Sequence, residues 1–201
     1  MESPVTAFAT DGVATGESAR NGRNAAGISL DGIGSRRSTI GDDLARLGSS
    51  TDSARLLTQY ARSDDPEMIL MALRGAKDIS SDTDRRVLLQ TVAARALRRK
   101  NAELRKAFFD ATLTMTSDTD LRVTLTHALP HGHADPEVTL AIFKSVARMS
   151  SDSDKRVTLS AAIDQKLLKT PAIRDAFMVA ARTIQSSTDF TVLMQLALTQ
   201  R

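Results

Sequence analysis

The residues best suited to hold a metal ion are three histidines and one aspartate near the middle of the chain. They are His127, His131, His133 and Asp135, and they lie within nine residues. Imidazole nitrogens and carboxylate oxygens both bind zinc. However, Pro130, Gly132 and Pro136 interrupt the same stretch, which is typical of a loop, and an aspartate just before a proline often starts a helix. We therefore interpret the group as a solvated loop and expect no metal site and no other cofactor.

The densest charge in the chain is a basic run between Arg85 and Lys106. It contains eight Lys or Arg residues and a single acid, Glu103. A patch of this size could meet phosphate groups, an acidic protein or an anionic membrane surface, or it could be a solvated corner between two helices. The candidate partner-binding residues within the run and on neighbouring helices are Arg98, Arg99, Lys100, Arg105, Lys106, Arg74, Lys144 and Arg174.

Composition excludes several classes of function. The 201 residues include no cysteine, which excludes disulfides, thiol catalysis and zinc–thiolate sites. One tyrosine and no tryptophan leave little with which to stack bases, and a net charge of +3 is too small to indicate nucleic-acid binding by itself. We find no nucleophile elbow, phosphate-binding loop or dinucleotide motif. We therefore expect no enzymatic activity.

The first part of the chain differs in composition from the rest. Residues 1–40 hold six of the ten glycines and otherwise mostly small polar residues with balanced charges. Such a segment has little apolar surface with which to offset its ordering entropy. We expect a flexible or extended N-terminal arm over 1–40, which is either a linker or a segment laid along a partner, followed by a helical repeat domain over 41–201.

Localisation is predicted from the absence of two signals. No apolar run approaches the length of a membrane span, and the N-terminus has neither a basic start nor an apolar segment. We expect a cytoplasmic protein without a transmembrane segment, with a peripheral position on a membrane complex as an alternative.

A short phrase recurs along the rest of the chain. Its last aspartate returns at steps of 32, 36, 34 and 35 residues. Every copy reads Ser-x-x-Asp, a spacing in which the serine caps a helix and the acid stabilises its first turn. The phrase therefore predicts five helix starts. Their capping residues are Ser49, Asp52, Ser81, Asp84, Ser117, Asp120, Ser151, Asp154, Ser186 and Asp189.

A second helix start lies between successive phrases. Asp-Pro-Glu stands at 65–67 and at 135–137, and Asn101 and Thr170 occupy the same place in the other units. This start always precedes the last aspartate of the next phrase by 19 residues, so the connection before it absorbs the variation in length. We predict second helices over 66–79, 102–115, 136–149 and 171–184.

Apolar residues recur at fixed places in both helices. A valine stands three residues after the phrase aspartate in four copies, and apolar residues stand five and nine residues after it in every copy. We interpret these positions as the buried face of the first helix. The second helix always has a small residue ten positions past its cap, which would let a neighbouring helix approach closely. These small residues are Gly75, Ala111, Ser145 and Ala180.

Acids and arginines also recur in three of the phrases. Asp82, Asp118 and Asp152 each stand four residues before an arginine, whereas the first and last copies lack both partners. A pair at this spacing within one helix contributes about 0.2–0.5 kcal/mol. We favour such local pairs. The alternative is a ladder in which each aspartate also meets the next repeat.

The paired phrases resemble a known repeat class. Two antiparallel helices in about 35 residues are typical of HEAT-like α-solenoids. The sequences SSDTDRRVLL, SDTDLRVTL and SDSDKRVTL are similar to HEAT-type repeats of certain bacterial proteins, including arrays that follow some beta-lactam-sensor-type membrane metallopeptidases. The resemblance covers residues 49–201. The chain has no His-Glu-x-x-His peptidase motif and no counterpart of the tetratricopeptide Trp and Tyr positions.

The resemblance implies an all-α, HEAT-like superhelix of about four helix pairs plus a terminal helix. Solenoids present long surfaces, so we expect a non-catalytic protein–protein interaction or scaffold module. We expect an accessory subunit of a larger assembly, docked through the N-terminal arm. The alternative is binding of nucleic acid or an anionic surface through the basic run.

Overall fold

The computed structural model describes residues 50–98 and 100–199, all of which lie within one compact unit, Asp43–Arg201. The predicted arm, the cap residue Ser49 and Arg99 lie outside the described residues. Within them every regular element is helical, which confirms the all-α prediction for this part of the chain.

The A helices begin within the repeated phrase. They are α2 (Ser50–Ala61), α4 (Asp82–Arg98), α6 (Asp118–Ala128), α8 (Asp152–Asp164) and α10 (Ser187–Thr199). The B helices are α3 (Pro66–Gly75), α5 (Ala102–Thr112), α7 (Pro136–Val146) and α9 (Pro171–Ala181). The described residues also contain two short 3-10 helices, η2 (Ala76–Asp78) and η3 (Leu129–His133).

The predicted helix starts are confirmed in the described residues. The Ser81, Ser117, Ser151 and Ser186 hydroxyls each accept a hydrogen bond from the N–H of the aspartate three residues later, at 3.2 Å in every case. The B helices begin at their predicted caps, and the side chains of Asp65, Asn101, Asp135 and Thr170 accept backbone N–H bonds there. Both kinds of start follow from local spacing alone.

The B helices end three or four residues earlier than predicted. Ile79, Met115, Met149 and Ile184 were expected to be the last helical residues, and all four are buried but lie beyond the helix ends. Each donates its N–H to the carbonyl three residues before, at 3.0–3.3 Å, so a tight turn carries its side chain into the core. The apolar spacing correctly predicts that these residues are buried. However, a tight turn after the helix buries them as well as a longer helix would.

The recurrent valines of the A helices are not part of the core. Val87, Val157 and Val192 are 37–45% exposed, and Val123 is half-buried. The prediction that they share the buried face is wrong because the third and fifth positions after the aspartate lie about 200° apart around a helix. The buried face instead runs through positions four, five, eight and nine, as in Leu88, Leu89, Val92 and Ala93 of α4.

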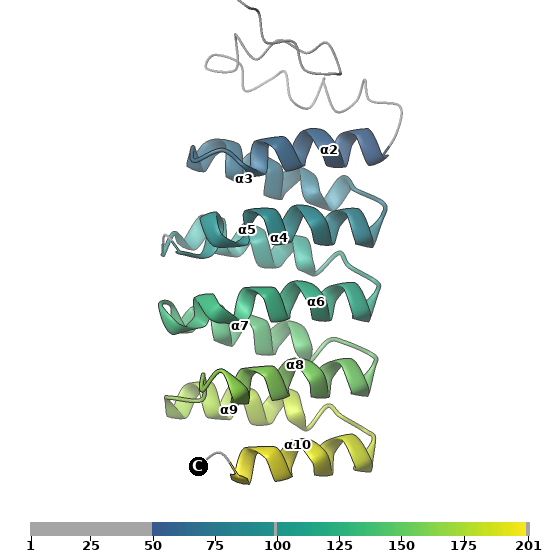
Figure 1. The fold of residues 1–201 in the computed structure, drawn as a ribbon, viewed down its shortest axis with the longest axis vertical. Helices are drawn as coiled ribbons and strands as arrows, with labels where there is room; N and C mark the ends of the chain where they lie inside the picture. Colours follow the sequence, from purple (N-terminus) through teal and green to yellow (C-terminus); the bar gives the residue numbers. More distant parts are fainter. Residues whose placement is uncertain (1–49, 99, 200–201) are drawn as a thin grey trace, which may run out of the picture. The chain divides into compact units, whose positions relative to one another are not determined.

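Helices pack in chain order within the described part. Each A helix contacts the next A helix, from α2 through α10, and each B helix contacts the next B helix, from α3 through α9 (Figure 1). The two sets of helices form two layers with the core between them. The recurrent small residues of the B helices are buried there, and a Cβ on Gly75 would lie 2.8 Å from Leu57 Cδ2 of α2. This contact agrees with the prediction of a close helix approach.

None of the described helices is both long and apolar enough to cross a membrane.

Candidate functional site

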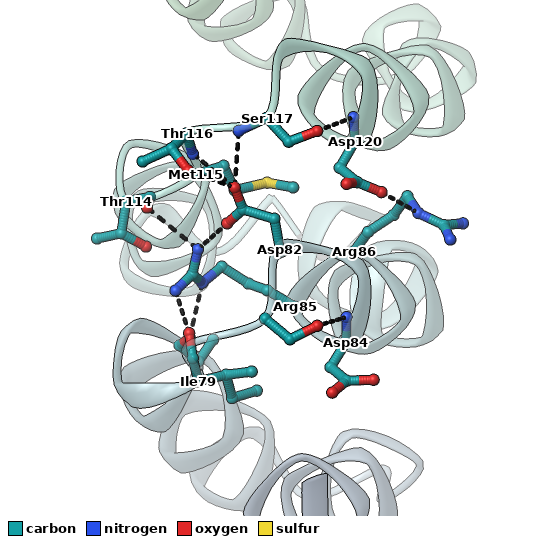
Figure 2. Close-up of polar contacts among 12 residues, drawn as sticks. Ile79, Asp82, Asp84, Arg85, Arg86, Thr114, Met115, Thr116, Ser117 and Asp120 are labelled. Carbon is teal, nitrogen blue, oxygen red and sulfur yellow. Dashed lines mark hydrogen bonds and ion pairs between the residues drawn. The ribbon is translucent and has the colours of Figure 1, made fainter. Parts of the chain in front are cut away.

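A polar ladder joins successive A helices at three junctions. At each junction an arginine near the start of one A helix meets the phrase aspartate of the next. Arg86 Nε lies 2.7 Å from Asp120 Oδ1, Arg122 Nε lies 2.7 Å from Asp154 Oδ1, and Arg156 Nε lies 2.6 Å from Asp189 Oδ1. Figure 2 shows the first of these contacts. Both ends of each rung are between 15% and 30% exposed, so they are partly shielded from water.

The first acid of each phrase forms a second set of contacts across the same junctions. Asp82 Oδ2 accepts the backbone N–H groups of Thr116 and Ser117, both at 2.7 Å, and the Thr116 hydroxyl at 2.9 Å (Figure 2). Asp118 and Asp152 accept the equivalent N–H groups before α8 and α10, at 2.6–2.9 Å. A carboxylate of one repeat thus binds the turn that leads into the next A helix.

These contacts decide between the two interpretations of the recurrent acid and arginine. The favoured local pairs, such as Asp82 with Arg86, are wrong, because each arginine pairs with the next repeat. The ladder is the arrangement that forms. The physical reason is the supply of donors. Partly buried N–H groups of a neighbouring turn need an acceptor and engage the first acid of the phrase, so the arginine pairs with the phrase aspartate of the next repeat instead.

Two cations are buried behind the ladder. The Arg85 side chain is only 5% exposed and donates to the carbonyls of Ala76, Ile79 and Thr114 and to the Asp82 carboxylate (Figure 2). Lys155 has the equivalent place in α8 and donates to Asp152 at 3.1 Å and to the Thr183 carbonyl at 2.8 Å. Each cation thus joins its A helix to the turn that follows the next B helix, at Thr114 or Thr183, and Arg85 also binds the turn after α3.

The sequence does not predict that Arg85 joins helix ends, because its place in the basic run suggests an exposed charge. A signal was present in the second to fifth copies, where the residue after the phrase aspartate is Arg85, Leu121, Lys155 and Phe190 in turn, while the first copy has Ser53. An alternation of apolar residues with long cations suits a position that points inward, where the aliphatic stem is buried and the charged end needs acceptors.

The ladder lowers the pKa values of three carboxyl groups. Burial alone would raise the pKa of Asp82, but the N–H groups of Ser117 and Thr116 outweigh it and leave the pKa below 3.8. The Ser186 N–H is the largest cause of the lowered pKa of Asp152. A hydrogen bond from Arg156 is the largest cause for Asp189. All three groups are therefore held in the ionised form.

The basic run does not form a single surface. Arg85 and Arg86 lie in the first turns of helix α4, about 18–20 Å from its far end at Arg98, and both belong to the ladder. Arg105 lies 2.5 Å from Asp135, and Lys106 lies 2.5 Å from Asp110. Arg98 and Lys100 remain exposed at the end of α4, with no ion-pair partner among the described residues.

Loops from three successive repeats bring further basic groups to the same side as Arg98. We call the set Arg98, Lys100, His131, His133 and Lys169 the A–B edge, because each lies where an A helix leads into its B helix. Lys169 Nζ lies 3.3 Å from His133 Nδ1. Burial, and then the charges of Arg98 and His127, lower the pKa of His131. These contacts place the three loops next to one another.

The histidine group has other structural partners. Asp135 accepts Arg105 through one oxygen and the N–H of Glu137 through the other, so this carboxylate is already engaged. In residues 50–98 and 100–199 no group of three or more His, Asp or Glu side chains is arranged to hold a metal ion.

The remaining candidate residues lie on the B helices, beside two grooves. Arg74 pairs with Glu103 at 2.9 Å across a groove of about 490 Å³ between α3 and α5. Lys144 of α7 is exposed. Arg174 lies in a second groove, of about 610 Å³, between α8, α9 and α10, which we call the terminal groove. The structure therefore does not bring Arg74, Lys144 and Arg174 together with Arg98.

Comparisons with models of protein families, with curated proteins and with solved structures find no match to this chain.

Proposed function

We propose that the chain is a HEAT-like α-solenoid that acts as a non-catalytic interaction or scaffold module. The observation that supports this most directly is the recurrence of the same bonds at three junctions. Arrays in which each repeat binds mainly its neighbours grow in length without closing on a core, and they present long surfaces to partners. The acids and arginines that lie close together act within this framework, so we assign them a structural role.

The proposed partner is a protein, and the chain serves as an accessory subunit of a larger assembly. Residues 1–40 are the proposed docking segment, because their composition suits binding better than burial in a core. The basic corner of Arg98, Arg99 and Lys100 offers the second contact. The exposed side of the B helices, with its two grooves and the charged groups around them, is the next surface to change.

The test is co-purification from native extract with three proteins. They are the full-length chain, residues 41–201 alone, and a full-length form with Arg98→Glu and Arg99→Glu. We expect the shortened chain to keep its melting temperature and to capture less partner. The charge-reversed form should lose partner mainly at low salt, since exposed charges are screened within about 10 Å at 0.1 M ionic strength. A full-length chain that captures no stoichiometric partner would contradict the proposal.

A second candidate function is binding of nucleic acid or another anionic surface. The A–B edge favours it, because the cations Arg98, Lys100 and Lys169 of two connections lie there, with the histidines of a third connection between them. Binding through phosphate contacts weakens steeply with salt. A duplex DNA titration at two salt concentrations separates the candidates: strong salt dependence with no protein partner supports this one, and absence of DNA binding excludes it.

A further inference from the structure

The terminal groove combines an apolar floor with cations of one sign. Its accessible apolar floor is formed by the half-buried Leu168, Met178 and Ala197, together with the buried Ile163 and Phe177. Lys166, Lys169 and Arg174 stand around it. No carboxylate is among its described lining residues. The groove between α3 and α5 differs, because Glu103 and Asp110 line it and pair with Arg74 and Lys106. Of these two grooves, the terminal groove is the one whose described lining has cations without acids.

The backbone at Lys166 gives an independent indication that this charge has a role. Lys166 has a φ of 54°, in the left-handed region that favours glycine. Its N–H donates to the Ile163 carbonyl at 2.7 Å, and the Leu167 N–H donates to the Ala162 carbonyl at 3.1 Å. This is the Schellman end of α8, where glycine is the usual residue. A lysine here makes the backbone less favourable and places a cation at the rim of the groove.

The same combination occurs once more in the described residues. Their only other non-glycine residue with a positive φ is Lys100, at 48°, in the connection between α4 and α5. Both strained positions therefore carry lysines, and both belong to connections from an A helix to its B helix. Strained backbone that is retained in this way is often tied to function.

The terminal groove is continuous with the A–B edge. Lys169 lines the groove and also contacts His133 of the preceding repeat at 3.3 Å. Arg174 donates to the carbonyls of Leu168 and Lys169, both at 3.3 Å, which fixes the loop between groove and edge. An occupant anchored in the groove can thus extend along further cations.

The chemistry of these surfaces selects the occupant. An apolar floor complements an apolar side chain, and cations without acids complement carboxylates. Nucleic acid is disfavoured because Phe177 is the one aromatic residue in the described lining and is only 2% exposed, so the groove offers no ring on which a base could stack.

We infer that the terminal groove docks an acidic protein segment through one bulky apolar side chain, with flanking carboxylates on Lys166, Lys169 and Arg174. The inference rests on the proposed role as a protein-binding module and gives the chemistry of its partner.

The test measures fluorescence anisotropy of full-length protein with labelled peptides. The main probe carries two adjacent leucines flanked by glutamates. One control peptide replaces the leucines with serine, and another replaces the glutamates with glutamine. Single-stranded DNA and anionic phosphatidylserine vesicles are the remaining probes. We expect the main probe to bind at least about tenfold more tightly than either control peptide, because both kinds of contact contribute.

Three variants locate the site. Lys166→Gly should weaken binding roughly three- to tenfold yet melt at the same or a higher temperature, because glycine relieves the left-handed backbone. Met178→Glu should abolish binding by placing an acid in the groove. Lys77→Gln, which removes a charge beside the other groove, should bind like the parent.

Several results would overturn the inference. One is that the serine peptide or DNA binds as tightly as the main probe. Another is that the vesicles bind and the peptides do not. A third is that the Lys166→Gly variant binds the main probe with parental affinity. A native partner still captured by Met178→Glu would overturn the groove assignment and leave the scaffold proposal intact. A chain that binds the main probe but captures no native partner would contradict the scaffold proposal alone.

Discussion

Individual side chains in this protein act mainly on their neighbours in the next repeat. Asp82 shows how one carboxylate can do so: one oxygen accepts donors from the turn before α6, and the other accepts Arg85 of its own helix. Three N–H or O–H donors that would otherwise compete for water are satisfied by a single ionised group. The consequence is that stability depends on the charge of Asp82 as well as on its shape.

Asp82→Asn should therefore destabilise the protein at neutral pH. Hydrogen bonds to charged groups contribute about 1.5–3 kcal/mol, and we expect a loss of free energy of unfolding in this range from chemical denaturation at pH 7. The exposed Asp175→Asn is the matched control and should change stability by less than about 0.5 kcal/mol. An unchanged unfolding midpoint for Asp82→Asn would show that the ladder contacts contribute nothing.

The same group makes stability depend on pH in a defined direction. The folded pKa of Asp82 lies below its ordinary value of 3.8, so its ionised form is favoured by folding. This contribution is complete above the unfolded pKa and is lost as the pH falls through the folded pKa. The parent should lose stability steeply below about pH 4, and Asp82→Asn should lose less over the same range. Unfolding curves measured between pH 7 and pH 2 compare the two directly.

At the scale of elements, the distance between helices is set by the small residues of the B helices. Ala111 and Ala180 are no more than 2% exposed, and at the equivalent place Gly75 has no room for a Cβ beside Leu57. Larger side chains at these places must push an A helix away from its B helix. Because every repeat uses the same place, the effect would spread to the next junction.

Ala111→Leu and Ala180→Leu should each lower the free energy of unfolding by about 1–3 kcal/mol through overpacking. Thermal melts followed by circular dichroism measure the effect. Ala172→Leu, on the exposed first turn of α9, is the control, because it adds the same volume without a buried neighbour. Parental melting temperatures for both buried variants would contradict the close approach of the helices.

The elements were largely predictable from the sequence, whereas their partners were not. Caps depend on residues two or three positions apart, so Ser117 and Asn101 could be recognised from spacing alone. The bond from Arg86 to Asp120 spans 34 positions, and nothing local distinguishes it from a pair with Asp82. The terminal groove was not predicted either, because its lining comes from three helices and from a loop whose backbone strain has no sequence signature.

At the scale of the whole repeat domain, the junctions are not equivalent. The ladder joins α4 to α6, α6 to α8 and α8 to α10. The place of the arginine in α2 is taken by Ala54, which is buried, so no rung reaches Asp84 from that helix. The direct contact between α2 and α4 therefore lacks a rung, although α4 also makes polar contacts with the first repeat, through Arg85 and the turn after α3 and through Arg95 and Asp64 at 3.5 Å. Stability in such arrays is close to a sum over repeats and junctions, so a weak junction opens first.

Hydrogen exchange should show this order directly. We expect backbone amides in α2 and α3 to exchange faster than those in α6 and α7, because the pair α2–α3 can separate without breaking a rung. Mass spectrometry of peptides from the full-length chain resolves the four helices. Equal protection would mean that apolar contacts at the first junction compensate fully for the missing ion pair.

Because the ladder contacts always run from one repeat to the next, one junction between A helices could replace another. Each rung needs only an arginine in one A helix and the phrase aspartate in the next, and the first acid of the phrase needs only the turn that follows its own repeat. A cassette from Asp118 to Ser151 could be removed with Ser117 joined to Asp152. The Asp82 contacts would stay as they are, and Arg86 would meet Asp154 in place of Asp120. A gene that encodes such cassettes can lengthen or shorten its product by unequal recombination without any compensating change at the new joint.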